Sequence, residues 1–107
     1  MLFHITSAAA WAEAQAQGTY RPASLATEGF IHLSEARQWP LAANRFFRGQ
    51  TGLLLLSISE KAVLAPLRRE AADGDLYPHL YGGLNLDAVV AVRALAPEAD
   101  GSFSAES

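Results

Sequence analysis

The chain of 107 residues contains no cysteine. This absence excludes disulfides, thiolate nucleophiles and cysteine-held zinc or iron–sulfur sites together. Long hydrophobic runs are missing too, because the run from Leu53 to Leu56 is far shorter than a membrane span. No basic and apolar leader precedes Leu2. We therefore expect a cytoplasmic protein with no membrane partner, whose chemistry depends on histidine, arginine, carboxylates and hydroxyls.

Positive charge is also scarce. Lysine and arginine contribute 8 residues against 11 aspartates and glutamates, which gives a formal net charge of −3. No block of like charge is long enough to act as a nucleic-acid or membrane-binding tail, so DNA is not an expected partner. Half of the residues are hydrophobic, and this apolar surface is sufficient to offset the conformational entropy lost on folding.

The length fits one domain with a single core. Residues 1–97 carry the strand-like and helical patterns, and residues 98–107 form a polar C-terminal tail that we expect to be mobile. Strands and helices do not alternate strictly enough for a doubly wound sheet. The predicted fold class is α+β, a single compact domain with a mixed or antiparallel sheet and two main helices. The oligomeric state stays open.

The two helices are expected at residues 8–17 and 35–48. Ser7 and Gly18 are suitable caps for the first, whose apolar positions Ala8, Trp11, Ala12 and Ala16 predict its buried face. Ser34 is a suitable N-cap for the second, which is interrupted or re-initiated at Pro40. The expected core consists of the leucines of residues 53–56 together with Trp11, Trp39, Phe46 and Phe47.

Short strand-like runs cover residues 2–6, 19–22, 30–33, 53–58, 66–71 and 90–95. The continuous apolar run 53–58 suits a central strand covered on both faces. A polar loop at residues 23–29 leads into the 30–33 run and is a candidate wall of a site. Residues 73–75 predict an acidic turn.

All three histidines, His4, His32 and His79, lie inside apolar or strand-like runs. An imidazole among large apolar neighbours needs a hydrogen-bond partner or a ligand to offset its desolvation. Each one taken alone is most simply a satisfied core residue, but three together indicate one polar pocket. Hydroxyl and aromatic side chains flank them and could orient a flat or polar ligand; these are Thr6, Ser34, Tyr77 and Tyr81.

Several familiar chemistries lack their motifs. The histidines do not show the i, i+2 or i, i+4 spacing of compact metal sites, so no metal is expected. There is no G-x-S-x-G nucleophile turn. The chain also lacks G-x-G-x-x-G and G-x-x-x-x-G-K-[ST], so a bound dinucleotide would not be held by a Rossmann turn or a P-loop.

Five blocks of the chain resemble the signature blocks of the bacterial DUF952 family, in the same order over residues 1 to about 96. They are His4-Ile5-Thr6, Tyr20-Arg21-Pro22, Gly29-Phe30-Ile31-His32-Leu33-Ser34, Ala43-Asn44-Arg45-Phe46-Phe47 and Tyr77-Pro78-His79-Leu80-Tyr81-Gly82. The family is uncharacterised, and its fold is similar to that of the ADP-ribosyltransferase superfamily. This resemblance implies a split sheet around an NAD-sized cleft, by fold-level analogy alone.

The resemblance also implies roles for individual residues. His4 would hold an NAD ribose, and His32 with Ser34 would support the nicotinamide half. His79 stands where the superfamily often has a glutamate, so Glu70 is the nearby carboxylate nominated to stabilise the charge that develops on the ribose. Arg45 could hold a pyrophosphate through its fork geometry. The implied catalytic residues are His32, His79 and Glu70; the implied ligand-binding residues are His4, Thr6, Tyr20, Ser34, Arg45, Tyr77 and Tyr81.

Three classes of function remain open. The first is an enzyme that acts on NAD, as substrate, or on another nucleotide, by ADP-ribosyl transfer or glycohydrolysis. The second is a non-catalytic module that binds a small nucleotide-like ligand. The third is a structural or protein-interaction domain. The placement of the histidines separates the first two from the third, and the presence of a catalytic carboxylate separates the first from the second.

Overall fold

The computed structural model describes residues 1–105, and its main sheet is built around strand β4 (Leu53–Ile58). β4 pairs antiparallel with β1 (Leu2–Ser7) on one side and with β8 (Val89–Leu95) on the other. The β1–β4 register runs from Leu2 opposite Ile58 to Ser7 opposite Leu53. The prediction of a central strand at residues 53–58 is confirmed, because four of its six side chains are buried.

A second three-stranded sheet has the order β3 (Ile31–His32), β6 (Asp75–Leu80) and β5 (Leu67–Ala72). The β5–β6 hairpin turns at Asp73 and Gly74, whose φ angles of 51° and 78° are both left-handed, so the predicted acidic turn is present. β2 (Thr19–Tyr20) and β7 (Leu84–Asn85) form a small separate pair. The described pairings are antiparallel, so the sheet predicted as mixed or antiparallel is antiparallel and divided into three parts.

Helix α1 (Ala8–Gln17) has the predicted bounds. The Ser7 side chain accepts a hydrogen bond from the Ala10 amide, and Gly18 ends the helix in a left-handed conformation with φ of 83°. The predicted buried face is wrong, because Ala14 is buried while the alanines at positions 8, 12 and 16 are exposed. Trp11 is half-buried against the core. Alanine occupies most faces of this helix, so its periodicity carries little information about orientation.

The second helix is shorter than predicted. α3 spans Trp39–Phe46, with Pro40 in its first turn, where the missing N–H is tolerated. Ser34 does not cap it, because Gln38 is the residue that precedes the helix; the backbone of Ser34 instead exchanges two 2.8 Å hydrogen bonds with Phe3 and so bridges the two larger sheets. Phe46, predicted to be core, is 60% exposed. The predicted loop at 23–29 contains a further short helix, α2 (Ser24–Thr27).

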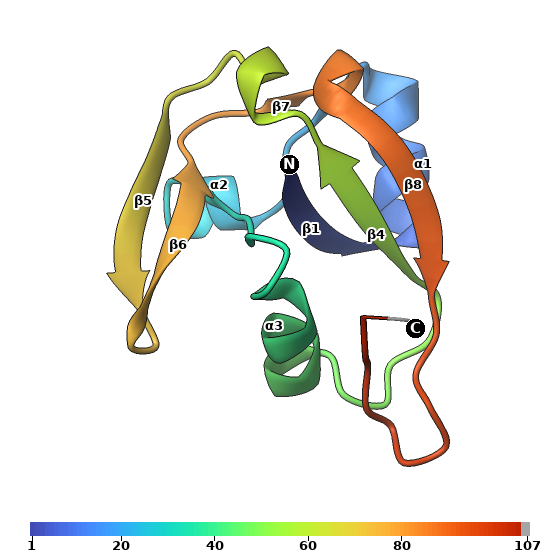
Figure 1. Ribbon diagram of the computed structural model, residues 1–107. Coiled ribbons are helices and arrows are strands. Elements are labelled where there is room, and N and C mark those ends of the chain that lie inside the picture. Colours follow the sequence, from blue (N-terminus) through green and yellow to red (C-terminus); the bar gives the residue numbers. More distant parts are fainter. Residues whose placement is uncertain (106–107) are drawn as a thin grey trace.

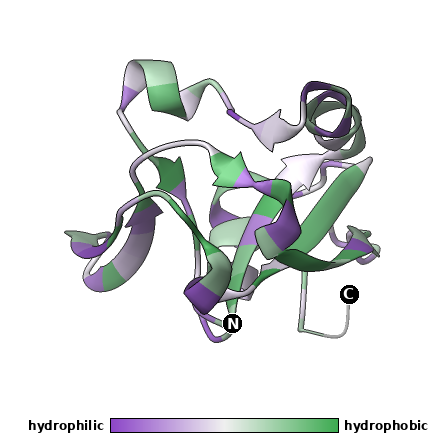
Figure 2. Ribbon diagram, turned by 90° about the horizontal axis from the view of Figure 1, so that it is seen from above, coloured by the Kyte–Doolittle hydropathy of each residue, from purple (hydrophilic) through white to green (hydrophobic). Residues whose placement is uncertain are grey.

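Two hydrophobic clusters lie on opposite faces of the main sheet. One packs β1, β4 and the second sheet beneath α1 and includes Leu2, Leu56 and Leu80. The other contains Trp39 of α3 packed against Ile5 and Leu55. Figure 2 shows hydrophobic segments running through the middle of the molecule and hydrophilic segments mostly toward its edges. Two short 3-10 helices, η1 (Glu60–Ala62) and η2 (Leu86–Ala88), connect the strands.

Part of the segment predicted as a mobile polar tail, residues 98–107, packs on the domain around Phe103, while residues 106 and 107 lie outside the described residues. Phe103 is 3% exposed in the cluster around Trp39. The Asn44 side chain donates to the Phe103 carbonyl at 2.8 Å and accepts from its amide at 2.7 Å. The buried Phe103 ring and the two hydrogen bonds from Asn44 thus hold this segment against α3.

Figure 1 shows the two three-stranded sheets on either side of the molecule, with α3 below and between them and α1 behind the main sheet. The start of α3 is tied to β6: Arg37 donates to both carboxylate oxygens of Asp75 at 2.6 and 3.0 Å, and the fully buried Gln38 donates to Asp75 and to the Leu76 carbonyl. Over residues 1–105, no helix has the length and apolar character needed to cross a membrane.

Candidate functional site

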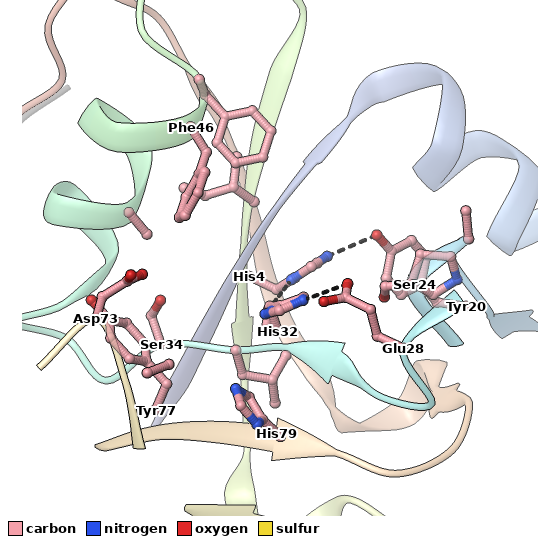
Figure 3. A pocket seen from close by; sticks show the side chains of 17 residues that line it. His4, Tyr20, Ser24, Glu28, His32, Ser34, Phe46, Asp73, Tyr77 and His79 are labelled. Carbon is pink, nitrogen blue, oxygen red and sulfur yellow. Dashed lines mark hydrogen bonds and ion pairs between the residues drawn. The ribbon is translucent and has the colours of Figure 1, made fainter. Parts of the chain in front are cut away.

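A cleft of about 640 Å³ opens between the two larger sheets, and all three histidines contribute to its wall. β1 supplies His4, β3 supplies His32 and β6 supplies His79. Figure 3 shows these three side chains at the centre of the site, with Phe46 above them. The volume lies within the range of about 300–1,000 Å³ that is typical of small-molecule sites. The convergence of the histidines expected from their sequence settings is therefore present.

His4 is satisfied by the protein itself. Its Nδ1 lies 2.6 Å from the His32 carbonyl oxygen, which can only accept, so Nδ1 carries the proton. Its Nε2 lies 2.8 Å from the Tyr20 hydroxyl, which in turn lies 3.0 Å from Thr6 Oγ1. Burial lowers the pKa of His4 from 6.5 to about 4. At neutral pH the ring is uncharged, and both of its nitrogens are engaged.

His32 is an exposed histidine with a carboxylate partner. Its Nε2 lies 2.9 Å from Glu28 Oε2, and both side chains are about half exposed. Glu28 follows α2 and also lines the cleft, so the pair presents an imidazole and a carboxylate to the same space. Figure 3 shows the two side chains meeting at the centre of the site. A histidine–carboxylate pair at a cleft wall can transfer protons to or from a bound molecule.

His79 is paired differently and lies deeper. It is 5% exposed, and its Nδ1 lies 2.9 Å from Glu70 Oε1. The Tyr81 hydroxyl donates to the same Glu70 oxygen. The hydrogen bond from Tyr81 and, to a smaller extent, the one from His79 hold the pKa of Glu70 below its usual value. Glu70 is therefore an ionised acceptor behind His79 and is absent from the cleft wall.

The Phe30 ring covers His79 and links the two histidines of the paired strands. Phe30 stacks on His79 with ring centroids 4.0 Å apart and planes inclined by 17°, and it meets His32 edge-on at 4.9 Å. His32 and His79 are direct cross-strand partners, with ring centroids 5.5 Å apart. The Nε2 atom of His79 is buried and has no hydrogen-bond partner in the described residues.

The mouth of the cleft is apolar on one side and acidic on the other. α3 and the residue after it contribute Phe46 and Phe47, while the β5–β6 turn contributes Asp73. Asp73 accepts from Arg45 at 3.1 Å. The formally charged side chains that line the cleft are the carboxylates Glu28 and Asp73. Arg45, 62% exposed, stands at the rim and is not part of the lining.

Six of the residues singled out in the sequence line this cleft. They are His4, Tyr20, His32, Ser34, Tyr77 and His79. The other four lie outside its wall: Thr6 contacts Tyr20 from below, Glu70 and Tyr81 lie behind His79, and Arg45 pairs with Asp73.

The loop at residues 23–29, predicted as a candidate wall of a site, does line the cleft through Ala23, Ser24 and Glu28, but sequence reasoning did not single out the carboxylates of Glu28 and Asp73. The i, i+4 spacing of Glu28 and His32 was the one available signal, but these positions span the end of α2 and a strand and do not belong to one helix. Phe46 was assigned to the core because it is large and apolar. Within residues 1–105, no three acidic or histidine side chains are grouped closely enough to hold a metal ion.

Comparisons with known proteins give one family and one set of related structures. The model of the family described as "Protein of unknown function (DUF952)" matches residues 5–92. The X-ray structure of protein CC0527 from Caulobacter crescentus is 36% identical in sequence, with 96% of this chain and 92% of that one covered and a TM-score of 0.89. The X-ray structure of a double mutant of CC0527 gives a TM-score of 0.88. The solution NMR structure of CC0527 gives 0.83, with 90% of that chain covered. No curated protein matches the chain.

Proposed function

The chain belongs to the DUF952 family, a family of unknown function, and on this premise we propose that its histidine-lined cleft binds a nucleotide-like small molecule, with NAD or ADP-ribose as the leading candidates. The observation that carries the proposal is the single cleft of about 640 Å³ on which His4, His32 and His79 converge. Two antiparallel sheets on either side of this cleft support the likeness to the ADP-ribosyltransferase superfamily, as an analogy of fold.

The aromatic and hydroxyl groups of the wall suit a nucleoside. Phe46 and Tyr77 offer flat faces for a base, and Ser34 and His32 offer hydrogen bonds to ribose hydroxyls. The charges of the wall do not suit a pyrophosphate, because Glu28 and Asp73 would repel it. A dinucleotide would therefore depend on Arg45, released from Asp73, to meet its phosphates.

Binding is tested by calorimetry with NAD, ADP-ribose and nicotinamide riboside. His32→Ala should weaken the binding of each by about 2- to 10-fold, since a hydrogen bond from this half-exposed side chain contributes about 0.5–1.5 kcal/mol. Lys61→Ala is the matched control, because Lys61 is exposed on η1 and absent from the cleft wall. Circular dichroism verifies the fold. If none of the three ligands binds the wild-type protein, the nucleotide proposal is wrong.

The enzyme form of the proposal is an ADP-ribosyltransferase or NAD glycohydrolase. Breaking the bond between ribose and nicotinamide develops positive charge on the ribose, which a carboxylate in the cleft can stabilise. Glu28 lines the cleft and Glu70 does not, so we now assign this role to Glu28 in place of Glu70. His32, held by Glu28, would accept the proton of the attacking hydroxyl or water.

Nicotinamide release from NAD tests this assignment. Glu28→Gln should slow release by about 100-fold or more, because the group acts mainly in the transition state. Glu70→Gln keeps an acceptor oxygen for His79 and should release nicotinamide at close to the wild-type rate. The reverse pattern would restore Glu70 as the catalytic carboxylate. Binding without release in the wild-type protein would favour the second candidate, a non-catalytic binding module, which is supported by the full engagement of His4 within the protein.

A further inference from the structure

The Nε2 atom of His79 is a buried polar atom for which the described residues provide no partner. Leaving such an atom unpaired lowers the stability of the folded state, and most buried polar atoms avoid this cost through a hydrogen bond. His79 is only 5% exposed, yet it contributes to the wall of the cleft. An unpaired nitrogen at this place indicates a missing partner in the cleft.

The protonation of the ring follows from its neighbours. Glu70 is ionised, because the hydrogen bonds from Tyr81 and His79 lower its pKa, and an ionised carboxylate can only accept. The proton of a neutral His79 must therefore sit on Nδ1, which faces Glu70 at 2.9 Å. Nε2 is then left with a lone pair. A carboxylate behind a histidine fixes the tautomer in this way in catalytic and metal sites.

We propose that Glu70 and Tyr81 are positioning residues that hold His79 with its Nε2 lone pair free, so that this nitrogen accepts a hydrogen bond from a hydroxyl or amide N–H of the molecule bound in the cleft. This inference rests on the proposed small-molecule function and adds the chemistry of one contact. The ligand must carry a hydrogen-bond donor at this depth, and a carboxylate or phosphate oxygen is excluded at Nε2, because two acceptors repel each other.

Phe30 covers one face of the His79 ring. It is half-buried, it stacks on His79 at 4.0 Å, and it follows Gly29, whose φ of 90° is left-handed. Nε2 has almost no surface in contact with solvent, so neighbouring atoms must shift before a ligand reaches it.

The tautomer is measured directly by nitrogen NMR on protein with ¹⁵N-labelled histidine rings. In the ligand-free wild-type protein, His79 should show a protonated Nδ1 and an unprotonated Nε2. Glu70→Ala removes the acceptor and should move the proton to Nε2, the preferred site in free imidazole side chains. Glu70→Gln retains a carbonyl oxygen and should restore the wild-type pattern. A wild-type ring with a protonated Nε2 would overturn the proposal, whether or not any ligand binds.

The contact itself is tested by adding ADP-ribose, NAD or nicotinamide riboside to the same labelled protein. The expected result is a large shift of the His79 Nε2 resonance on binding, with about a tenfold or greater loss of affinity in His79→Phe, which keeps the aromatic stack on Phe30. Binding that shifts only His32 would refute the contact at His79. If no probe binds, the nucleotide function fails separately, while the ligand-free tautomer still decides whether Glu70 positions the ring.

Discussion

His4 is buried in its neutral form, so we expect its contribution to the free energy of unfolding to fall in mild acid. A single substitution should remove this effect. The pKa of His4 falls from 6.5 to about 4 because its ring is buried between β1 and Tyr20. The His4 ring is therefore protonated at a lower pH in the folded state than in the unfolded state. Above pH 6.5 the His4 ring is unprotonated in both the folded and the unfolded state, so it does not reduce the free energy of unfolding. Between pH 6.5 and about 4 the unfolded state gains the proton, and stability falls as the pH falls.

The difference between 6.5 and about 4 sets the size of the effect. Each pK unit corresponds to about 1.4 kcal/mol, so the full loss from His4 amounts to about 3 kcal/mol. His4→Gln is the chosen variant, because its amide N–H can donate to the His32 carbonyl and its oxygen can accept from Tyr20. It cannot ionise, so this component of the pH dependence should vanish.

The assay is urea unfolding of both proteins at pH 7, 6, 5 and 4, followed by circular dichroism. The gap in unfolding free energy between wild type and His4→Gln should shift by about 3 kcal/mol in favour of the variant over this range. Carboxylates with lowered pKa, such as Glu60 and Glu70, contribute stability that is lost at lower pH, and they do so in both proteins. Parallel curves from pH 7 to 4 would show that His4 is not held neutral by burial.

Three further substitutions test individual contacts through the free energy of unfolding in urea. Tyr20→Phe removes the hydroxyl that lies between the histidine and the threonine of β1, and should cost about 1–3 kcal/mol. Asn44→Ala removes both hydrogen bonds to Phe103, and should make the C-terminal segment sensitive to limited proteolysis as well as less stable. Gly82→Ala would place a Cβ 2.8 Å from the Ala65 Cβ at a φ of 154°, and should cost about 1–3 kcal/mol, which Ala65→Gly should partly restore.

Local signals predicted the elements that depend on a few neighbouring residues. Ser7 and Gly18 identified α1, and the leucines of 53–58 identified the central strand, because caps and apolar runs act over short distances. The orientation of α1 was not predictable, because its alanines look alike on every face. Phe46 shows the same limit, since hydrophobicity alone does not distinguish a core side chain from the wall of a cleft.

The site was predicted as a group of histidines but not as a set of pairs. Whether a carboxylate faces the cleft or lies behind a histidine depends on strand register. Glu70 sits opposite Tyr77 and Arg68 opposite His79, a register set by the two-residue turn of the β5–β6 hairpin. The pairing of Glu28 with His32 depends on how α2 ends, and the predicted polar loop carried no sign of that helix.

The order of strands in the main sheet has a consequence for synthesis of the chain. β1 begins at Leu2, but its partner Ile58 lies at the end of β4, so residues 3–57 must be synthesised before the first strand can pair along its whole length. β8 can join only after residues 89–95 have also been synthesised. Until then β1 and the leucine-rich β4 expose unpaired edges, which favours capture by chaperones or self-association. Assembly of the main sheet therefore waits for β4, the strand with which both β1 and β8 pair.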